Sequence, residues 1–178
     1  MPQILVRPAV SPDVEHLSKL DHNLRTNRVW QMHQQSEKDA IQTTFKESTL
    51  PRAMRLIYPH SPDTLIKRWK SYSILLVGCV DSKPISYISL DTYSTPTLVW
   101  VKDLVVDLIW RRKGIASTLL KAAGDWGVER GFHQLLLECS SKNYPGIMLS
   151  KKSGFEFSGF NDQYFLNNDI AIFFSKFV

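Results

Sequence analysis

The chain has 178 residues, of which 43% are hydrophobic, and it carries a formal net charge of +5 at neutral pH. These values are typical of a soluble globular protein, and we expect one domain over residues 1–178. No apolar run approaches the roughly 20 residues of a membrane span, and the N-terminus lacks the hydrophobic region of a signal peptide. We therefore expect a cytoplasmic protein with no membrane partner. The net charge favours a polyanionic partner, which includes both nucleic acid and a phosphorylated cofactor.

The N-terminal part of the chain predicts a strand followed at once by a helix. The strand covers residues 3–9, and Ser11 begins the helix, because Pro and Asp directly after it are typical of a helix start. The apolar stripe of this helix would consist of Val14, Leu17, Leu20 and Leu24. Residues 26–58 are polar and weakly periodic, and we expect a second helix between Glu37 and Ser48. A third, short helix is predicted over residues 63–70.

Strands dominate the middle of the sequence. The segments SILLVGCV (73–80) and ISYISLDTY (85–93) flank a turn at residues 81–84 and predict a β-hairpin. The segment LVWVKDLVVD (98–107) is rich in Val and Leu, which indicates a buried strand that extends the antiparallel meander. A further strand is expected at 133–140, then a short helix opening near Pro145 and two final strands around 154–160 and 169–177.

The segment RRKGIA (111–116) places three cationic residues before Gly114 and then begins an amphipathic helix with the apolar stripe Ile115, Leu119, Ala122 and Trp126. A helix N-terminus directs unpaired N–H groups and the positive end of its dipole at the preceding loop, which favours an anion there. Gly114 would let the backbone approach that anion closely, and Ala116 keeps the first turn small. An ordinary strand–helix turn with a solvated charge cluster is the alternative interpretation.

Several common sites are absent from the sequence. It contains no GxxxxGK[ST], GxGxxG, HExxH or CxxC motif, and its five histidines show no metal-ligand spacing. We therefore expect no bound metal, and we expect each histidine to be either solvated or hydrogen-bonded. Cys79 and Cys139 lie in apolar segments and are expected to be buried thiols without a disulfide. The basic residues cluster at one loop without an aromatic–basic stripe, which argues against nucleic acid as the partner.

Two motifs relate the chain to a known family. Arg111 to Ala116 matches the pattern Arg or Gln, two residues, Gly, one residue, Gly or Ala. NYPGIMLSKKSGF (143–155) matches a second element that begins with Asn and ends in Lys-x-Gly-Phe. With these motifs and the opening VRPAVSPDVEHLSKL, the sequence resembles the GNAT superfamily of acyl-CoA N-acyltransferases. The run LLLECSSKNYPG is also similar to the streptothricin acetyltransferases.

This resemblance implies a mixed α/β fold with a central, mostly antiparallel sheet of about seven strands and flanking helices. The sheet would be splayed between its fourth and fifth strands. Acetyl-CoA would be the co-substrate, with its pantetheine along one splayed strand and its pyrophosphate on the backbone amides of residues 112–117. The residues expected to bind the coenzyme are Leu104, Val105, Val106, Arg111, Arg112, Lys113, Gly114, Ile115, Ala116, Ser117, Asn143 and Lys152.

The implied reaction is direct attack of an amine on the thioester, with no covalent enzyme intermediate and with an oxyanion stabilised by a backbone N–H of the splayed strand. An alkyl ammonium with a pKa near ~10 needs a base at neutral pH. Glu138 and Asp103 interrupt apolar strands and are the candidates, directly or through a water. A structural role, in an ion pair or a hydrogen-bond network, is the alternative for each. Many relatives carry a Glu near position 102, where this chain has Lys102.

In the family, the acid that protonates the departing thiolate is commonly a Tyr four residues before the Gly of the second motif. This chain has Ser150 at that position. Tyr144 is the candidate that takes its place, with Tyr164 as a further option. A thiol with a pKa near ~8.5 is a tolerable leaving group as the thiolate. A general acid therefore contributes less to the rate here than the usual ~10²–10⁴-fold.

The sequence thus predicts an acetyl-CoA-dependent N-acetyltransferase acting on a primary amine. A catalytically idle acyl-CoA-binding module with a regulatory or interaction role is the second hypothesis, motivated by Lys102 and Ser150. The amine acceptor is unidentified, and a homodimer is compatible with the sequence. The family resemblance implies an acceptor site built from the N-terminal region and residues 161–168. Four aromatic residues are candidates to line a pocket: Trp30, Tyr93, Trp100 and Trp110.

Overall fold

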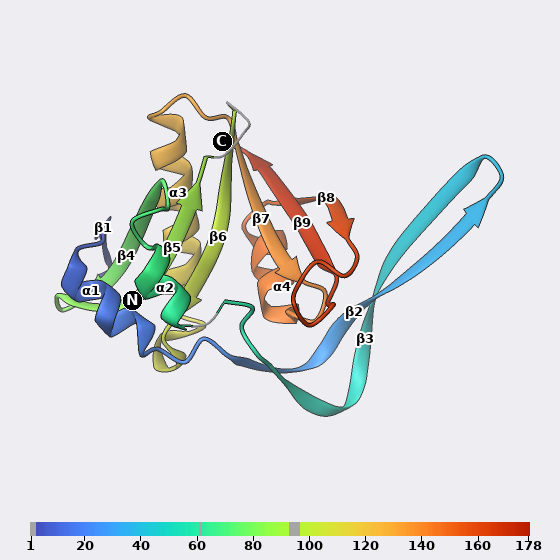
Figure 1. Ribbon diagram of the computed structural model, residues 1–178, viewed down its shortest axis with the longest axis horizontal. Coiled ribbons are helices and arrows are strands. Elements are labelled where there is room, and N and C mark those ends of the chain that lie inside the picture. The colour runs from blue at the N-terminus through green and yellow to red at the C-terminus, as the bar shows by residue number, and fades with distance from the viewer. Residues whose placement is uncertain (1–2, 61, 93–96) are drawn as a thin grey trace.

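The computed structural model describes residues 3–60, 62–92 and 97–178. A seven-stranded sheet forms the body of the molecule, and a two-stranded sheet projects from it as a long arm (Figure 1). The first elements in chain order are β1 (Leu5–Pro8), α1 (Ser11–Ser18), β2 (Leu24–Glu37), β3 (Ala40–Leu56), α2 (Pro62–Arg68), β4 (Ile74–Val80) and β5 (Lys83–Asp91). They are followed by β6 (Leu98–Val106), the 3₁₀ turn η1 (Leu108–Trp110), α3 (Ile115–Val128), β7 (Gln134–Ser140), α4 (Tyr144–Lys152), β8 (Glu156–Asn161) and β9 (Ala171–Phe177).

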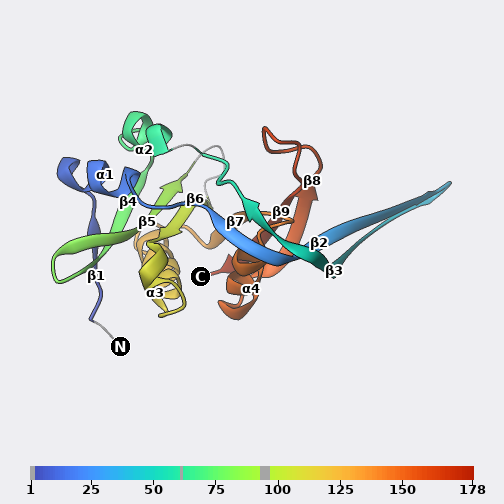
Figure 2. The same cartoon turned by 90° about the horizontal axis from the view of Figure 1, so that it is seen from below.

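The central sheet has the strand order β1-β4-β5-β6-β7-β9-β8, and β6–β7 is its one parallel pair. Parallel neighbours need a crossover connection, which α3 supplies between these two strands. Helices α1 and α2 lie on one face of the sheet, and α3 and α4 lie on the other (Figure 2). The predicted mixed α/β fold, with a mostly antiparallel seven-stranded sheet and flanking helices, is therefore confirmed.

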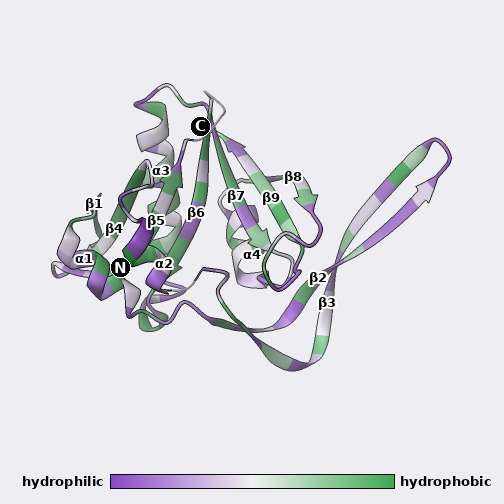
Figure 3. Cartoon of the chain, in the orientation of Figure 1, coloured by the Kyte–Doolittle hydropathy of each residue, from purple (hydrophilic) through white to green (hydrophobic). Residues whose placement is uncertain are grey.

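Apolar side chains fill both interfaces between the sheet and its helices. Figure 3 shows that apolar residues are concentrated in the central strands. On α3, Ile115 and Leu119 of the predicted stripe are almost fully buried, while Ala122 and Trp126 pack at the margin of the same core. Burying one such Leu or Ile side chain stabilises the fold by about 1.5–3 kcal/mol. Cys79 and Cys139 are buried free thiols, in different strands of the sheet.

The arm corrects the prediction for residues 26–58. The helix expected between Glu37 and Ser48 does not form, because β2 and β3 pair there in antiparallel register from Leu24↔Leu56 to Glu37↔Ala40. Most residues of the outer half of the arm are exposed on both faces, so the alternation of apolar and polar residues that reveals a half-buried strand is missing. The pairing partners at the base of the arm are also distant in the sequence, as in the pair Leu24↔Leu56.

The short N-terminal helix agrees with its predicted start at Ser11 but ends at Ser18. Val14 and Leu17 are buried as expected, whereas Leu24 is the first residue of β2. No helix among residues 3–60, 62–92 and 97–178 combines the length and the apolar character needed to cross a bilayer.

The β4–β5 hairpin forms where the sequence predicts it, with a tighter turn. Asp81 and Ser82 alone connect the strands, with φ of 48° and 63°. Two consecutive residues with positive φ are characteristic of the type I′ turn, whose twist matches that of the flanking strands. Lys83 and Pro84, expected in the turn, are the first residues of β5.

Candidate active site

Strands β6 and β7 separate halfway along their length. Their register runs from Leu98↔Gln134 to Val101↔Leu137 and stops there, although β6 continues to Val106 and β7 to Ser140. Beyond this point β7 pairs only with β9, and Figure 1 shows the two strands diverging. The β7 side of Leu104–Val106 therefore has no neighbouring strand. This is the splay that the family resemblance implies.

A β-bulge and a charge pair mark the apex of the splay. Ser89 faces Asp103 while Leu90 faces Val101, so Lys102 is the extra residue on β6. The Lys102 ammonium lies 3.2 Å from Oε2 of Glu138, and this ion pair spans the two strands directly after their last backbone pair. The Tyr164 hydroxyl donates to the same Oε2 at 2.9 Å. Glu138 is thus a buried carboxylate at the apex, with Oε2 occupied by two donors.

Asp103 lies on the α1–α2 face of the sheet and is the centre of a hydrogen-bond cluster. Its side chain is 3% exposed. The hydroxyls of Tyr58 and Tyr72 donate to it at 3.0 Å each, and that of Ser89 at 2.7 Å. Nδ1 of His60 lies 2.8 Å from Oδ1. Each carboxylate oxygen therefore has two partners, supplied by β5, by the residues around α2 and by the segment after β3.

The electrostatics of this cluster favour an ionised Asp103 beside a basic His60. Burial alone would raise the pKa of Asp103, but the hydrogen bond and positive charge of His60, with the hydroxyls of Ser89 and Tyr72, hold that pKa below its usual value. The hydrogen bond to Asp103 raises the pKa of His60, against the opposing effect of burial. Burial and the Asp103 charge raise the pKa of Tyr72, so this phenol stays a hydrogen-bond donor.

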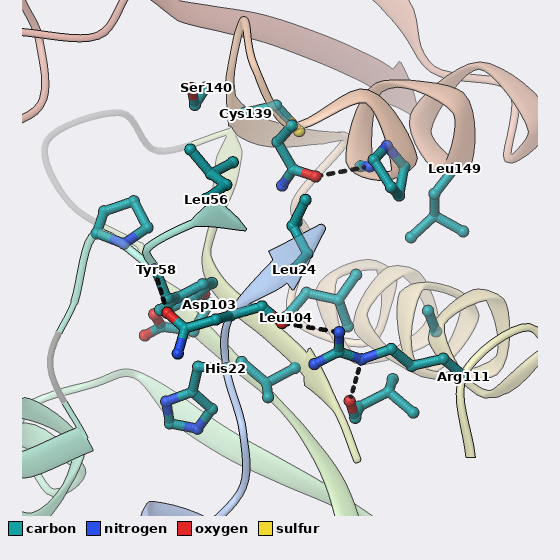
Figure 4. Close-up of a pocket in the computed structure, with 18 of the residues that line it drawn as sticks. His22, Leu24, Leu56, Tyr58, Asp103, Leu104, Arg111, Cys139, Ser140 and Leu149 are labelled. Atoms are coloured by element: carbon teal, nitrogen blue, oxygen red, sulfur yellow. Dashed lines mark hydrogen bonds between the residues drawn. The ribbon is translucent and has the colours of Figure 1, made fainter. Parts of the chain in front are cut away.

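Two cavities meet at the apex. The main cavity, of about 1150 Å³, runs from the N-terminus of α3 along β6 to Asp103 and Glu138. Figure 4 shows Asp103, Leu104 and Arg111 on one side of it and Cys139 and Ser140 on the other, with Leu24 and Leu56 from the base of the arm between them. A second cavity, of about 420 Å³, is bordered by Arg68, Tyr164 and Leu166. His60, Lys102 and Glu138 line both cavities.

The loop before α3 has the conformation that a close backbone approach requires. Gly114 has φ 84°, in the left-handed region, and a Cβ built on it meets no atom within 4 Å. Ile115 is nearly inaccessible, so it offers only its backbone, and Ala116 and Ser117 border the cavity in the first turn of the helix. The N-terminus of α3 thus opens into the main cavity with free space in front of Gly114. These residues fit an anionic group such as a pyrophosphate.

The three cations of this loop differ in what they contact. The Arg111 guanidinium donates to the carbonyls of Val106 at 2.9 Å, Asn23 at 2.8 Å and Asp21 at 2.5 Å, which ties the end of β6 to the segment between α1 and β2. The Lys113 ammonium lies 4.5 Å from the centre of the Trp110 ring, and Lys113 does not border the cavity. Arg112 does border it. Of the predicted site residues, all except Lys113 line the main cavity.

Helix α4 supplies the other side of the cavity. Asn143 caps it, with Oδ1 accepting from the Gly146 N–H at 2.9 Å. The Tyr144 hydroxyl accepts from Nη1 of Arg28 at 3.1 Å, which leaves its own proton available to a ligand. Ser150 is fully buried, and its hydroxyl donates to the Gly146 carbonyl at 2.9 Å, so it is a structural residue of the helix.

Sequence reasoning missed the residues that arrive from the segment between β3 and β4. Tyr58, His60 and Tyr72 belong to no motif, and only their contacts with Asp103 identify them. Of the aromatic residues expected at a pocket, Trp110 lines the main cavity. Trp30 packs against the central core and lies under Lys151, and Trp100 packs edge-on against Phe173. Tyr93 lies outside the described residues. Both segments expected at the acceptor site, the N-terminal region and residues 161–168, contribute to the lining.

Comparisons with known proteins agree with this geometry. A sequence model of the acetyltransferase (GNAT) family matches residues 39–155. An L-amino acid N-acetyltransferase of Escherichia coli K12, AaaT, is 31% identical over 100 residues, which cover 52% of this chain and 59% of that protein. The match thus spans less than two thirds of the relative's length.

Solved structures share the fold over nearly the whole chain. The structure of a nourseothricin acetyltransferase superposes with a TM-score of 0.82 at 20% identity, covering 98% of each chain. A protein of Bacillus anthracis described as a streptothricin acetyltransferase, determined in complex with acetyl coenzyme A, has a TM-score of 0.78 at 17% identity and covers 99% of this chain and 100% of its own.

Proposed function

Because this chain belongs to the acetyltransferase (GNAT) family, we propose that it transfers the acetyl group of acetyl-CoA to a primary amine by direct attack within a ternary complex. The observation that carries the proposal is one continuous cavity. It begins at the open N-terminus of α3 and ends at two buried carboxylates, Asp103 and Glu138, at the apex of the splay. A site for a large anionic co-substrate and a site for proton transfer are thus joined.

The coenzyme would lie along the main cavity. The backbone N–H groups of residues 112–117 would hold its pyrophosphate, and Arg112 is the loop cation that borders this space. Arg111 contributes by holding the end of β6 in place through its three carbonyl contacts. The unpaired side of Leu104–Val106 would accept the pantetheine as an added strand, and Asn143 and Lys152 line the opposite wall.

The chemical step needs an oxyanion donor, a proton acceptor and a leaving thiolate. A backbone N–H of the splayed segment of β6 would stabilise the oxyanion. Glu138 could take the proton through Oε1, which has no hydrogen-bond partner among the described residues. Asp103 could take it only through His60, because its oxygens are already fully engaged. The Tyr144 phenol borders the cavity and is the proposed donor to the thiolate.

The acceptor would enter from the second cavity. Its volume of about 420 Å³ suits a small molecule or one side chain of a larger one. The names of the relatives point to free amino acids and to streptothricin-type compounds as the first amines to examine.

A catalytically idle coenzyme-binding module is the second candidate. Ser150 is buried in α4 and cannot serve as an acid, and Lys102, at the position where the family resemblance implies a Glu, is paired with Glu138. Both candidates require coenzyme binding and differ only in turnover.

Thermal denaturation with acetyl-CoA and with coenzyme A tests the shared part. Saturation at 100 times the dissociation constant should add about 2.7 kcal/mol to the free energy of unfolding. An amine panel with detection of released thiol then separates the two candidates. Thiol release on any amine excludes the idle module, and coenzyme binding without release on any amine would contradict the enzyme.

A further inference from the structure

His60 occupies the junction of the two cavities in an orientation that one hydrogen bond determines. Its Nδ1 lies 2.8 Å from Oδ1 of Asp103. An ionised carboxylate can only accept hydrogen bonds, so Nδ1 carries a proton and Nε2 of the neutral ring carries the lone pair. Nε2 has no hydrogen-bond partner among the described residues, and 32% of the side chain is exposed to the cavities.

Asp103, by contrast, has no free position for a substrate proton. It is 3% exposed, and three hydroxyls and one imidazole saturate its two oxygens. His60 borders both cavities, whereas Asp103 borders only the main cavity, so in the second cavity, the proposed entry of the acceptor, it is His60 and not Asp103 that an amine can contact. The arrangement is that of a carboxylate that fixes the tautomer of a histidine and stabilises its protonated form.

We propose that His60 is the proton acceptor for the amine and that Asp103 is its positioning residue. This inference rests on the proposed acetyl transfer and assigns the proton to His60, supported by Asp103, in place of direct transfer to Glu138. The bound ammonium gives one proton to Nε2 of His60. The freed lone pair forms the new N–C bond, the C–S bond breaks, and its electron pair leaves with the thiolate. The second amine proton is lost to solvent, and the Tyr144 phenol gives its proton to the thiolate, so that the products are the amide and the thiol. Exchange with solvent then reprotonates Tyr144 and removes the proton from His60.

The charges around His60 suit this role. Asp103 and Lys102 approach it from β6 and Glu138 from β7, while Arg68 from α2 and Tyr164 from the β8–β9 connection border the same cavity. The hydrogen bond to Asp103 raises the pKa of His60 above its ordinary 6.5, burial opposes the rise, and Glu138 adds to it against the repulsion of Lys102. A base whose pKa lies near the working pH is the most effective one.

The test is the pH profile of kcat/KM for the variant His60→Gln, measured with the full chain and the best amine of the panel. In the wild type, kcat/KM should rise with pH through the pKa of His60 and then level off while the ammonium is still protonated. In His60→Gln it should be lower by ~10²–10⁴ at neutral pH and should keep rising towards the amine pKa near ~10, because only free amine reacts. A merely structural defect would lower the rate at every pH and leave the plateau in place.

Three companion variants sharpen the result. His33→Gln changes an exposed histidine of the arm and should leave the profile as in the wild type. Glu138→Gln should keep the plateau in the pH profile of kcat/KM, even if the rate constant itself is lower than in the wild type. Asp103→Asn should move the rising limb to lower pH, because His60 loses the anion that raises its pKa.

The outcomes separate the two proposals. If the plateau of kcat/KM persists in His60→Gln, the role of His60 is overturned. If the plateau is lost in Glu138→Gln instead, the proton is assigned to Glu138. In both cases acetyl transfer stands. A wild type that binds the coenzyme but acetylates no amine overturns acetyl transfer and this inference with it.

Discussion

Replacing Gly114 with Val should weaken coenzyme binding far more than it weakens the fold. Gly114 has φ 84°, and an L-residue in this left-handed region costs about 1–2 kcal/mol of stability. No atom lies within 4 Å of the added Cβ, so the Cβ itself meets no neighbour in the folded chain. Gly114 lines the main cavity at the N-terminus of α3, where the pyrophosphate is proposed to bind. A branched side chain there should raise the coenzyme dissociation constant at least tenfold, which is about 1.4 kcal/mol.

The chain contains a matched control for the backbone strain. Gly131, beyond the C-terminal end of α3, has φ 79° and also has no atom within 4 Å of an added Cβ, but it does not border the cavity. Gly131→Val should therefore lose a similar 1–2 kcal/mol, which lowers Tm by roughly 2–4 °C per kcal/mol in a chain of this size, and should bind the coenzyme as the wild type does.

Urea denaturation and calorimetric titration with coenzyme A measure the two quantities separately. A folded Gly114→Val protein with wild-type affinity would refute the reasoning and place the phosphate site elsewhere. Equal loss of affinity in both variants would show that strain in α3, and not obstruction, controls binding.

Three further outcomes follow from single contacts. Arg111→Lys should cost about 1.5–3 kcal/mol in urea denaturation, because lysine cannot reproduce the guanidinium's contacts with three carbonyls; unchanged stability with reduced coenzyme affinity would instead assign the guanidinium to the phosphates. Ser82→Gly should stabilise the β4–β5 turn by about 0.5–1 kcal/mol, since Ser82 has φ 63°, without changing kinetics; a loss of stability would contradict this. The free energy of unfolding that His60→Gln removes should be larger at about pH 5 than at about pH 9. The raised pKa of His60 makes its stabilisation complete below the ordinary 6.5 and lost as pH rises through the folded-state value, so equal losses at the two pH values would argue against the ion pair with Asp103.

The sequence by itself determined the features that depend on near neighbours. Apolar runs predicted most strands of the central sheet, and the spacing of Ile115 and Leu119 predicted α3, because burial of a repeated face needs only a local pattern. Gly114 before a helix start predicted an anion site because the N–H groups of a helix N-terminus are unpaired in any helix. The family resemblance added the splay of the sheet, and the pairing of β6 with β7 confirmed it.

Only the tertiary structure decided the arm and the surroundings of the two carboxylates. The arm depends on pairing such as Leu24↔Leu56, and its two exposed faces leave no apolar period in the sequence. Asp103 alone, as one acidic residue in an apolar strand, predicts equally a base or a buried hydrogen-bond acceptor. Which of these it becomes depends on partners from distant segments, such as Tyr58 and His60, that lie 45 and 43 residues away. A buried charge must be satisfied by whatever groups the fold brings to it, so local pattern revealed the carboxylate but could not reveal the histidine in front of it.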